Sequence, residues 1–205
     1  MMNKNLEQVL IATKNKGKMA EFKGIFEKYN MKAISLLDLS SNIEDVEETG
    51  ETFEENARLK AEQISSILNA PVIADDSGLV IDALDGRPGV YSARYAGLNK
   101  NDQDNNSKVL DELKDVPMEN RTARFVCVLA VARPGQETFF VTGTCEGKIA
   151  YSEIGINGFG YDPIFIPKGH SKTMAEISPD KKNQISHRGR AINKLDEWLK
   201  TLSNK

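Results

Sequence analysis

Short apolar runs alternate along the chain with segments whose apolar residues recur every three or four positions. Val9–Ala12 is a continuous apolar run that predicts a buried strand, and the apolar residues between Met19 and Phe26 have helical spacing. A polar loop separates the two, and Met31–Leu37 predicts a second strand. The chain therefore opens with a strand, a loop, a helix and another strand.

Capping signals mark a long helix in the second quarter of the chain. Thr52 lies three residues before Glu55, the spacing of a capping box, and apolar positions at helical spacing follow as far as Leu68. Asn69-Ala70-Pro71 ends this helix. Two further strands are expected, at residues 71–74 and 79–84.

The second half of the chain adds a hairpin to these strand–helix segments. Asn101–Lys114 predicts a mostly polar helix, and Ser178 followed by Pro179 predicts the start of another. A hairpin is expected over 122–132 and 137–143, and a short strand over 163–167. Because a hairpin lies among strand–helix segments, we expect an α/β fold with a mixed sheet.

Composition and charge disfavour nucleic-acid-coating, membrane-spanning, secreted and disulfide-rich proteins. The 205 residues carry 27 basic and 30 acidic side chains, a net charge of −3, which disfavours a nucleic-acid-coating protein. The longest apolar run, Phe125–Ala132, is too short to cross a membrane, and the first residues do not read as a secretory signal. Two cysteines predict no disulfide framework, and no linker rich in Pro, Gly or Ser divides the chain. We therefore expect a cytoplasmic enzyme or binding protein with no nucleic-acid or membrane partner.

The loop after the first strand is a candidate anion site. It consists of Thr13, Lys14, Asn15, Lys16, Gly17 and Lys18. Free N–H groups and the positive end of the dipole at a helix start favour an anion. The three lysines add charge, and a glycine lets the backbone approach a ligand closely. The alternative is an ordinary solvated connection.

Two acidic groups are candidates for metal binding or acid–base chemistry. Asp75 and Asp76 follow a predicted strand, and neighbours in an extended segment point to opposite faces, so one would serve the site and the other support it. A turn with local side-chain hydrogen bonds is the alternative. Glu47 and Glu48 precede a capped helix whose start does not need them, so one could reach a metal. Magnesium takes one or two carboxylates together with waters and phosphates.

Two later segments could recognise a base or an anion. Phe159, Gly160, Tyr161 and Asp162 read either as a plain turn or as an aromatic shelf on which a base stacks beside an acid. Lys182, His187 and Arg188 concentrate positive charge, although His187 alone is more typical of a surface or structural residue. A metal–triphosphate complex requires cations, carboxylates and an aromatic surface, and the chain offers all three.

Together with their flanking residues, the candidate site residues match the motifs of a known protein family over nearly the whole chain. The sequence resembles the inosine triphosphate pyrophosphatase family, which acts on non-canonical purine nucleoside triphosphates. The matching segments, in the order of the family, are Ile11–Lys18 with Glu21, Glu47–Gly50 with Thr52-Phe53 and Glu55–Ala57, Ala74–Leu79, Pro88–Gly97, Gly158–Pro163 and Ile185–Gly189.

The resemblance implies a fold, a reaction and an assembly. It implies a single domain over residues 1–205, with a long mixed β-sheet flanked by helices and two lobes around a central cleft. It also implies a homodimer. The implied reaction is the magnesium-dependent hydrolysis of inosine, deoxyinosine and xanthosine triphosphates to monophosphate and pyrophosphate, which removes deaminated purines from the nucleotide pool.

The resemblance also assigns roles to residues. Thr13–Lys18 would grip the triphosphate, and Glu47 and Asp76 would hold Mg²⁺, with Glu48 as the alternative to Glu47. Asp76 would also orient or deprotonate the attacking water. The residues expected to contact the nucleotide are Ser77, Phe159, Gly160, Tyr161, Asp162, Lys182, His187 and Arg188.

Two rival functions remain open from the sequence. One is a related pyrophosphatase that acts on modified pyrimidines or other damaged bases. The other is a nucleotide sensor without catalysis, which is disfavoured because Asp76 and the Glu47-Glu48 pair are both present. A nucleic-acid binder is disfavoured further, since the basic residues are clustered for one anion instead of spread along a stripe.

Overall fold

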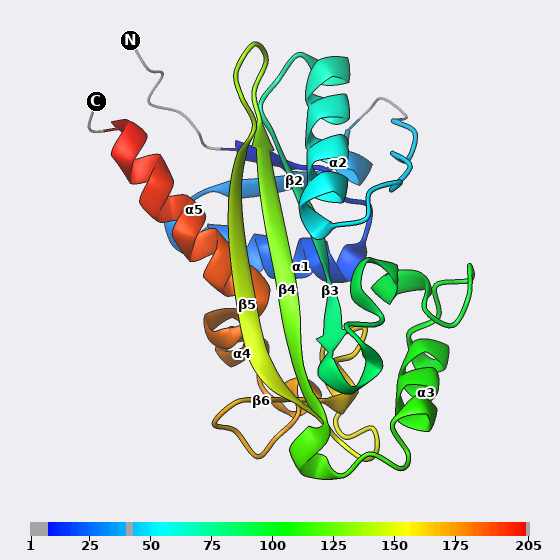
Figure 1. Cartoon of the computed structure of the whole chain (residues 1–205). Coiled ribbons are helices and arrows are strands. Elements are labelled where there is room, and N and C mark those ends of the chain that lie inside the picture. The colour runs from blue at the N-terminus through cyan, green and yellow to red at the C-terminus, as the bar shows by residue number, and fades with distance from the viewer. Residues whose placement is uncertain (1–7, 40–42, 204–205) are drawn as a thin grey trace. The chain divides into compact units, whose positions relative to one another are not determined.

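A six-stranded mixed β-sheet flanked by helices forms the fold (Figure 1). The computed structural model describes residues 8–39 and 43–203. In sheet order β2-β1-β3-β4-β5-β6, the strands are Lys32–Ser35, Gln8–Ile11, Val72–Ile81, Thr122–Ala132, Phe139–Ile149 and Phe165–Pro167. β1 is parallel to β2 and β3, and β6 is antiparallel to β5. The expected α/β fold with a mixed sheet is confirmed.

The helices include the one that the sequence bounds with a capping box and Asn69. They are α1 (Lys16–Phe26), α2 (Phe53–Leu68), α3 (Asp102–Glu112), α4 (Pro179–Ile185) and α5 (His187–Ser203). At the start of α2, Thr52 Oγ1 accepts from the Glu55 N–H and Glu55 Oε2 accepts from the Thr52 N–H, both at 3.1 Å. Asn69 ends α2 in the left-handed conformation with φ 47°. None of the helices within 8–39 and 43–203 is long and apolar enough to cross a membrane.

β3 corrects the prediction of two short strands. It runs without a break from Val72 to Ile81, so the alternative interpretation of Asp75–Gly78 as a turn is wrong. Asp, Ser and Gly favour turns because their side chains or backbones satisfy local hydrogen bonds. Here β3 lies between β1 and β4 in the sheet, and hydrogen bonds to neighbouring strands keep the segment extended.

The chain divides into two compact units. Unit 1 comprises residues 1–76, 128–142 and 191–205, and unit 2 comprises residues 77–127 and 143–190. Strands β3, β4 and β5 each contribute residues to both units. The division within β3 falls between Asp76 and Ser77, two consecutive residues that the sequence marked as functional.

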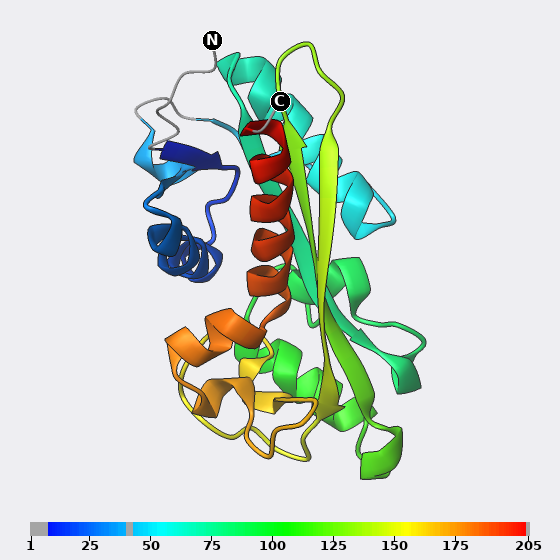
Figure 2. The same ribbon diagram turned by 90° about the vertical axis from the view of Figure 1, so that its left-hand side faces the viewer.

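In unit 1, helices lie on both faces of the sheet (Figure 2). Phe139 and Phe140 are neighbours in β5 and therefore point to opposite faces. The Phe139 ring stacks on Trp198 of α5, with 3.9 Å between ring centroids. On the other face, the Arg58 guanidinium of α2 lies 4.6 Å from the centroid of the Phe140 ring. The two helices thus cover opposite faces of this end of β5.

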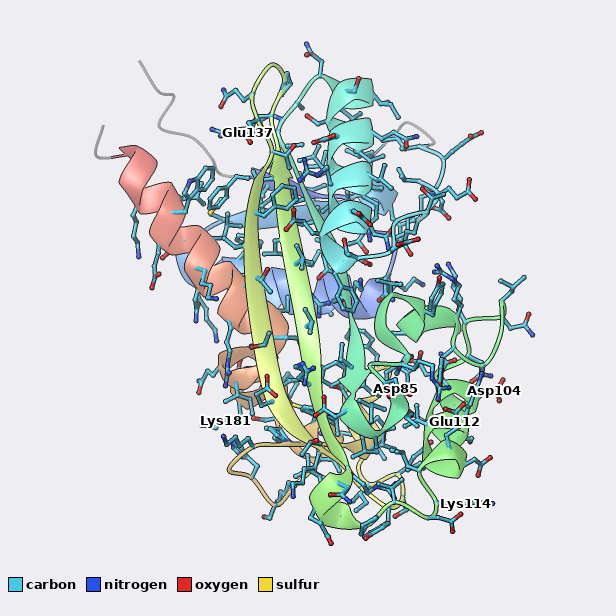
Figure 3. All side chains as sticks on the ribbon, in the orientation of Figure 1. Asp85, Asp104, Glu112, Lys114, Glu137 and Lys181 are labelled. Carbon is cyan, nitrogen blue, oxygen red and sulfur yellow. The ribbon has the colours of Figure 1, made fainter. Side chains whose placement is uncertain are left out.

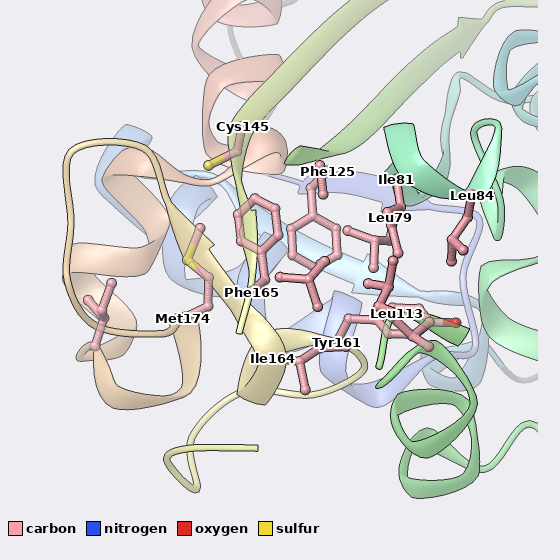
Figure 4. Packing of buried hydrophobic residues seen from close by; sticks show 14 residues of the cluster. Leu79, Ile81, Leu84, Leu113, Phe125, Cys145, Tyr161, Ile164, Phe165 and Met174 are labelled. Carbon is pink, nitrogen blue, oxygen red and sulfur yellow. The ribbon is translucent and has the colours of Figure 1, made fainter. Parts of the chain in front are cut away.

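Unit 2 has its own hydrophobic core (Figure 4). Leu79 and Ile81 of β3 are fully buried in it, and the rings of Phe125 and Phe165 pack at a centroid distance of 4.6 Å. Tyr161, which lies near the end of the Gly-rich segment 155–162 before β6, belongs to the same cluster. The core thereby anchors the C-terminal side of that segment.

Candidate active site

The turn between β1 and α1 presents backbone donors at a helix start. Asn15 caps α1, because its side-chain Oδ1 accepts from the Lys18 N–H at 2.9 Å. Thr13 Oγ1 in turn accepts from the Asn15 N–H at 3.1 Å. The N–H groups of Lys16 and Gly17 in the first turn have no acceptor within the helix. Together with the helix dipole, they favour an anion at this position.

The three lysines of this turn have different surroundings. Lys14 Nζ lies 2.8 Å from Asp45 Oδ1 at the surface, whereas Lys18 Nζ lies 2.5 Å from Asp75 Oδ1. The Asp75 side chain is fully buried, so its carboxylate holds the Lys18 ammonium in a defined place. Lys16 is exposed. Of the three, Lys18 is the one fixed by a buried partner.

Asp75 and Asp76 contact lysines of two different helices, as expected for neighbours in a strand. Asp75 pairs with Lys18 of α1, while Asp76 Oδ1 lies 3.2 Å from Lys60 Nζ of α2. The Lys60 ammonium also donates to Glu48 Oε1 at 2.8 Å and to the Asp75 carbonyl oxygen at 2.7 Å. Lys60 therefore joins the two acidic segments that the sequence singled out separately.

Sequence reasoning missed Lys60. A lysine on a helix is normally solvated, but only 12% of this side chain is exposed. One signal for it exists in the sequence. Lys60 lies four residues before the apolar Ile64, so the two share a helix face. In the structure Ile64 and Asn56, four residues before Lys60, are both buried. The lysine thus lies on the buried face of α2.

The acidic segment Glu47–Gly50 is held in place by a hydrogen bond to Asn56 in the first turn of α2. Asn56 is fully buried, and its Oδ1 accepts from the Gly50 N–H at 2.8 Å. A Cβ at Gly50 would lie 2.7 Å from the same oxygen, so the close approach requires glycine. Glu48 is half-buried beside Lys60, whereas Glu47 is exposed. The role of Glu47 as a metal ligand stays a prediction. Glu48 and Asp76 both accept a hydrogen bond from the Lys60 ammonium.

The neighbours of Asp76 and Lys60 shift their pKa values. Burial raises the pKa of Asp76, and Glu48 and Asp75 raise it further, so that it lies above its usual value although Lys60 and Lys18 act in the opposite direction. Burial lowers the pKa of Lys60, but the three carboxylates outweigh burial and raise it. Asp76 is thus a buried carboxyl with an elevated pKa beside an ammonium whose pKa is also raised, a combination suited to accepting a proton.

Asp76 also offers a free oxygen to a cation. Its Oδ2 is buried and has no hydrogen-bond partner within the described part of the chain. Among those residues, no group of three His, Cys, Asp or Glu side chains could enclose a metal ion. Mg²⁺ does not need such a group, because it usually completes its octahedron with waters and substrate phosphates. The donor set fits a Mg²⁺ ion shared with a substrate.

In unit 2, Ser77 and the start of α5 form a second polar group. Arg188 Nη2 donates to Ser77 Oγ at 2.9 Å, and only 1% of Arg188 is exposed. The His187 ring stacks on Phe125 at a centroid distance of 4.8 Å and is also buried. His187 and Arg188 are therefore buried parts of unit 2 and do not form a charged cluster on its surface.

The segment Gly158–Asp162 is held by the Asp162 carboxylate. Asp162 Oδ2 accepts from the Phe159 N–H at 2.8 Å and binds the Lys182 ammonium, which lies 4.9 Å from the centroid of the Phe159 ring. Gly158 has φ 79°, and a Cβ there would collide with the Asp162 carboxylate. The backbone of Phe159 is thus held by Asp162, and the Lys182 ammonium lies over the face of its half-buried ring.

The structure separates the two aromatic residues expected on one shelf. Tyr161 is 4% exposed and its hydroxyl donates to the Ser92 carbonyl oxygen at 2.7 Å. Its ring packs in the core of unit 2, while the Phe159 ring is half-exposed. Contact of Tyr161 with a nucleotide stays a prediction, because the ring serves packing in this structure.

Comparison with known proteins identifies the family. The model of the Ham1 family matches residues 9–198. The chain belongs to the Ham1 family. A relative from Oceanobacillus iheyensis, named dITP/XTP pyrophosphatase, is 63% identical over 197 residues, which cover 96% of this chain and all of the relative. One from Halalkalibacterium halodurans with the same name is 56% identical over 194 residues, covering 95% of this chain and all of the relative.

Solved Ham1 structures agree with the fold. The Ham1 protein of Staphylococcus aureus superposes with a TM-score of 0.83 at 49% identity, covering 95% of this chain and 98% of that protein. The HAM1 protein of Coxiella burnetii gives 0.80 at 40% identity with the same coverage. The family resemblance inferred from the motifs is confirmed.

Proposed function

We propose that this Ham1 protein hydrolyses non-canonical purine nucleoside triphosphates, namely those of inosine, deoxyinosine and xanthosine, to the monophosphate and pyrophosphate. The names of its relatives support this substrate class. The observation that carries the proposal is the Lys60 ammonium bonded to both Glu48 and Asp76, with an unpartnered buried oxygen on Asp76. The reaction would remove deaminated purines from the nucleotide pool.

The residues of unit 1 would bind the triphosphate and its cation. Thr13–Lys18 would bind phosphate oxygens through the first-turn amides of α1 and through lysine side chains. Asp76 and one of Glu47 and Glu48 would hold Mg²⁺, and the contact with Lys60 favours Glu48. When bound, Mg²⁺ neutralises charge on the phosphate oxygens.

The chemical step would be attack of water on the α-phosphorus. A new phosphorus–oxygen bond forms to the water, and the bond from the α-phosphorus to the oxygen that bridges to the β-phosphorus breaks, so that pyrophosphate leaves with the bonding electrons. Asp76 accepts the proton of the water, and its elevated pKa suits this role. The Lys18 and Lys60 ammonium groups stabilise negative charge as it moves to the leaving group.

The residues of unit 2 would bind the nucleoside. Ser77, Gly160, Tyr161, Asp162 and Lys182 would contact it, the base would stack on Phe159, and a donor from His187, Arg188 or the backbone near Phe159 would pair with the 6-keto oxygen. The same donor would be left unpaired against the amino group of adenine, which costs about 1–3 kcal/mol. One such donor would therefore select against adenine.

We also propose, from the family resemblance, that the protein is a homodimer that acts in the cytoplasm. Sedimentation equilibrium would give twice the mass of one chain. A single species with the mass of one chain at micromolar concentration would contradict the dimer.

The Asp76→Asn variant tests the proposed reaction. Asparagine has nearly the same shape but accepts no proton, so we expect about a 1,000-fold loss of kcat in pyrophosphate release with a native circular dichroism spectrum. Asp111→Asn, an exposed change on α3, is the control and should keep the wild-type rate. A near-normal rate in Asp76→Asn would show that this residue is not the base.

A further inference from the structure

Two residues of the polar helix α3 hold the glycine that follows Phe159. Asp102 Oδ2 accepts from the Gly160 N–H at 2.7 Å, and Asn106 Nδ2 donates to the Gly160 carbonyl oxygen at 3.2 Å. Asp102 and Asn106 are four residues apart, so their side chains lie on one face of α3. Both backbone polar groups of Gly160 are therefore bonded to the same helix face.

Asn106 is an unusual residue for a contact that serves packing alone. It is 2% exposed, and its Oδ1 has no hydrogen-bond partner within the described residues. A buried acceptor without a partner costs about 1–3 kcal/mol. The amide must place its nitrogen toward Gly160, because its oxygen would otherwise face another carbonyl oxygen. What Asn106 contributes, and a leucine of similar size would lack, is this bond to the loop.

The bonds to Gly160 fix the backbone on the C-terminal side of Phe159. The Gly160 N–H belongs to the peptide group that joins it to Phe159, so the Asp102 bond sets the plane of that peptide. The peptide on the other side of Phe159 is held by Asp162, which accepts from the Phe159 N–H. Gly160 itself has φ 60°, a conformation that glycine adopts without strain. Both peptides that flank the ring are thus bonded to carboxylates.

We infer that Asp102 and Asn106 are positioning residues for the Phe159 ring and set how tightly the protein holds the purine base. The inference rests on the proposed function, in which Phe159 stacks on the base. Neither residue needs to touch the nucleotide or the reacting phosphorus. Loosening their bonds to Gly160 should therefore weaken binding of the base and leave the chemical step largely intact.

The experiment compares Asp102→Ala with Asp104→Ala. Both aspartates lie in the first turn of α3 and are exposed, so both substitutions remove the same charge from the same helix end. Figure 3 labels Asp104 on this helix. Of these two aspartates, Asp102 is the one that accepts a hydrogen bond from the Gly160 N–H. For inosine triphosphate, we expect Asp102→Ala to raise KM about tenfold with kcat within about threefold of wild type, and Asp104→Ala to change neither. Asp102→Asn, which keeps an acceptor oxygen, should restore most of the binding.

A second readout does not depend on activity. In the free protein, amide hydrogen exchange at Gly160, followed by NMR, should be about tenfold faster in Asp102→Ala than in wild type and unchanged in Asp104→Ala. Unaltered exchange in Asp102→Ala would overturn the inference. So would a lowered kcat with an unaltered KM, which indicates a role in the chemical step.

The outcomes separate this inference from the proposed function. If the wild-type protein released no pyrophosphate from inosine triphosphate, the proposed function would fail and the base-binding role of Asp102 with it. If the wild type were active and Asp102→Ala had the KM of Asp104→Ala, only the inference would fail.

Discussion

At the scale of single residues, Asp76 and Lys60 form the central contact of the site. The Asp76 carboxyl has opposing neighbours, because Lys60 lowers its pKa and Glu48 raises it. The net shift is upward because burial disfavours the charged form. Removing either neighbour should therefore move the pKa of Asp76 in a known direction.

Titration of the metal-free protein checks this balance. Lys60→Met removes a positive charge 3.2 Å from Asp76 Oδ1, so the pKa of Asp76 should rise further and the carboxyl should stay protonated to higher pH. Glu48→Gln removes a negative charge, so the pKa should fall toward the ordinary value. The measurement is the carboxyl ¹³C shift of Asp76 against pH. Shifts of the same sign in both variants would contradict the assigned surroundings.

The sequence located the acids of the site but not the lysine that joins them. Asp75-Asp76 and Glu47-Glu48 are visible because paired acids are unusual at a strand and before a helix cap. Lys60 is not visible in the same way, because a lysine among helix formers normally points to solvent. Its burial depends on Glu48 and Asp76, which are 12 and 16 residues away and are brought to it by the fold.

At the scale of elements, β3 is connected to α1 and α2 by its two aspartates. Caps at Thr52 and Ser178 were predictable because a cap depends on a few adjacent residues. The continuity of β3 was not, because local propensity marks Asp-Asp-Ser-Gly as a turn. Hydrogen bonding to the neighbouring strands β1 and β4, which no local window contains, keeps the segment extended.

The Lys18–Asp75 pair should contribute more to the free energy of unfolding than the Lys14–Asp45 pair. Lys18→Met leaves a fully buried carboxylate without its ammonium, so we expect about 3–5 kcal/mol less free energy of unfolding in urea. Lys14→Met breaks a pair in which Asp45 is 81% exposed, and should cost less than about 1 kcal/mol. Equal losses for the two variants would mean that Asp75 is stabilised without Lys18.

At the scale of the whole molecule, the chain places the proposed phosphate-binding residues in unit 1 and the proposed base-binding residues in unit 2. The mixed sheet was predictable from the order of strands, helices and hairpin. The division into units was not, because β3, β4 and β5 contribute to both and no linker rich in Pro, Gly or Ser marks a boundary. The order of motifs nevertheless identified the family, since those motifs recur as a set.

The most direct test of the account is pyrophosphate release from a panel of triphosphates, with and without Mg²⁺. We expect kcat/KM for inosine, deoxyinosine and xanthosine triphosphates to exceed that for ATP, GTP and deoxyuridine triphosphate by about 100-fold or more, and activity to require the metal. Pyrophosphate and the monophosphate should form in equal amounts. A preference for deoxyuridine triphosphate or for the ordinary purines, or release of orthophosphate instead of pyrophosphate, would contradict the account.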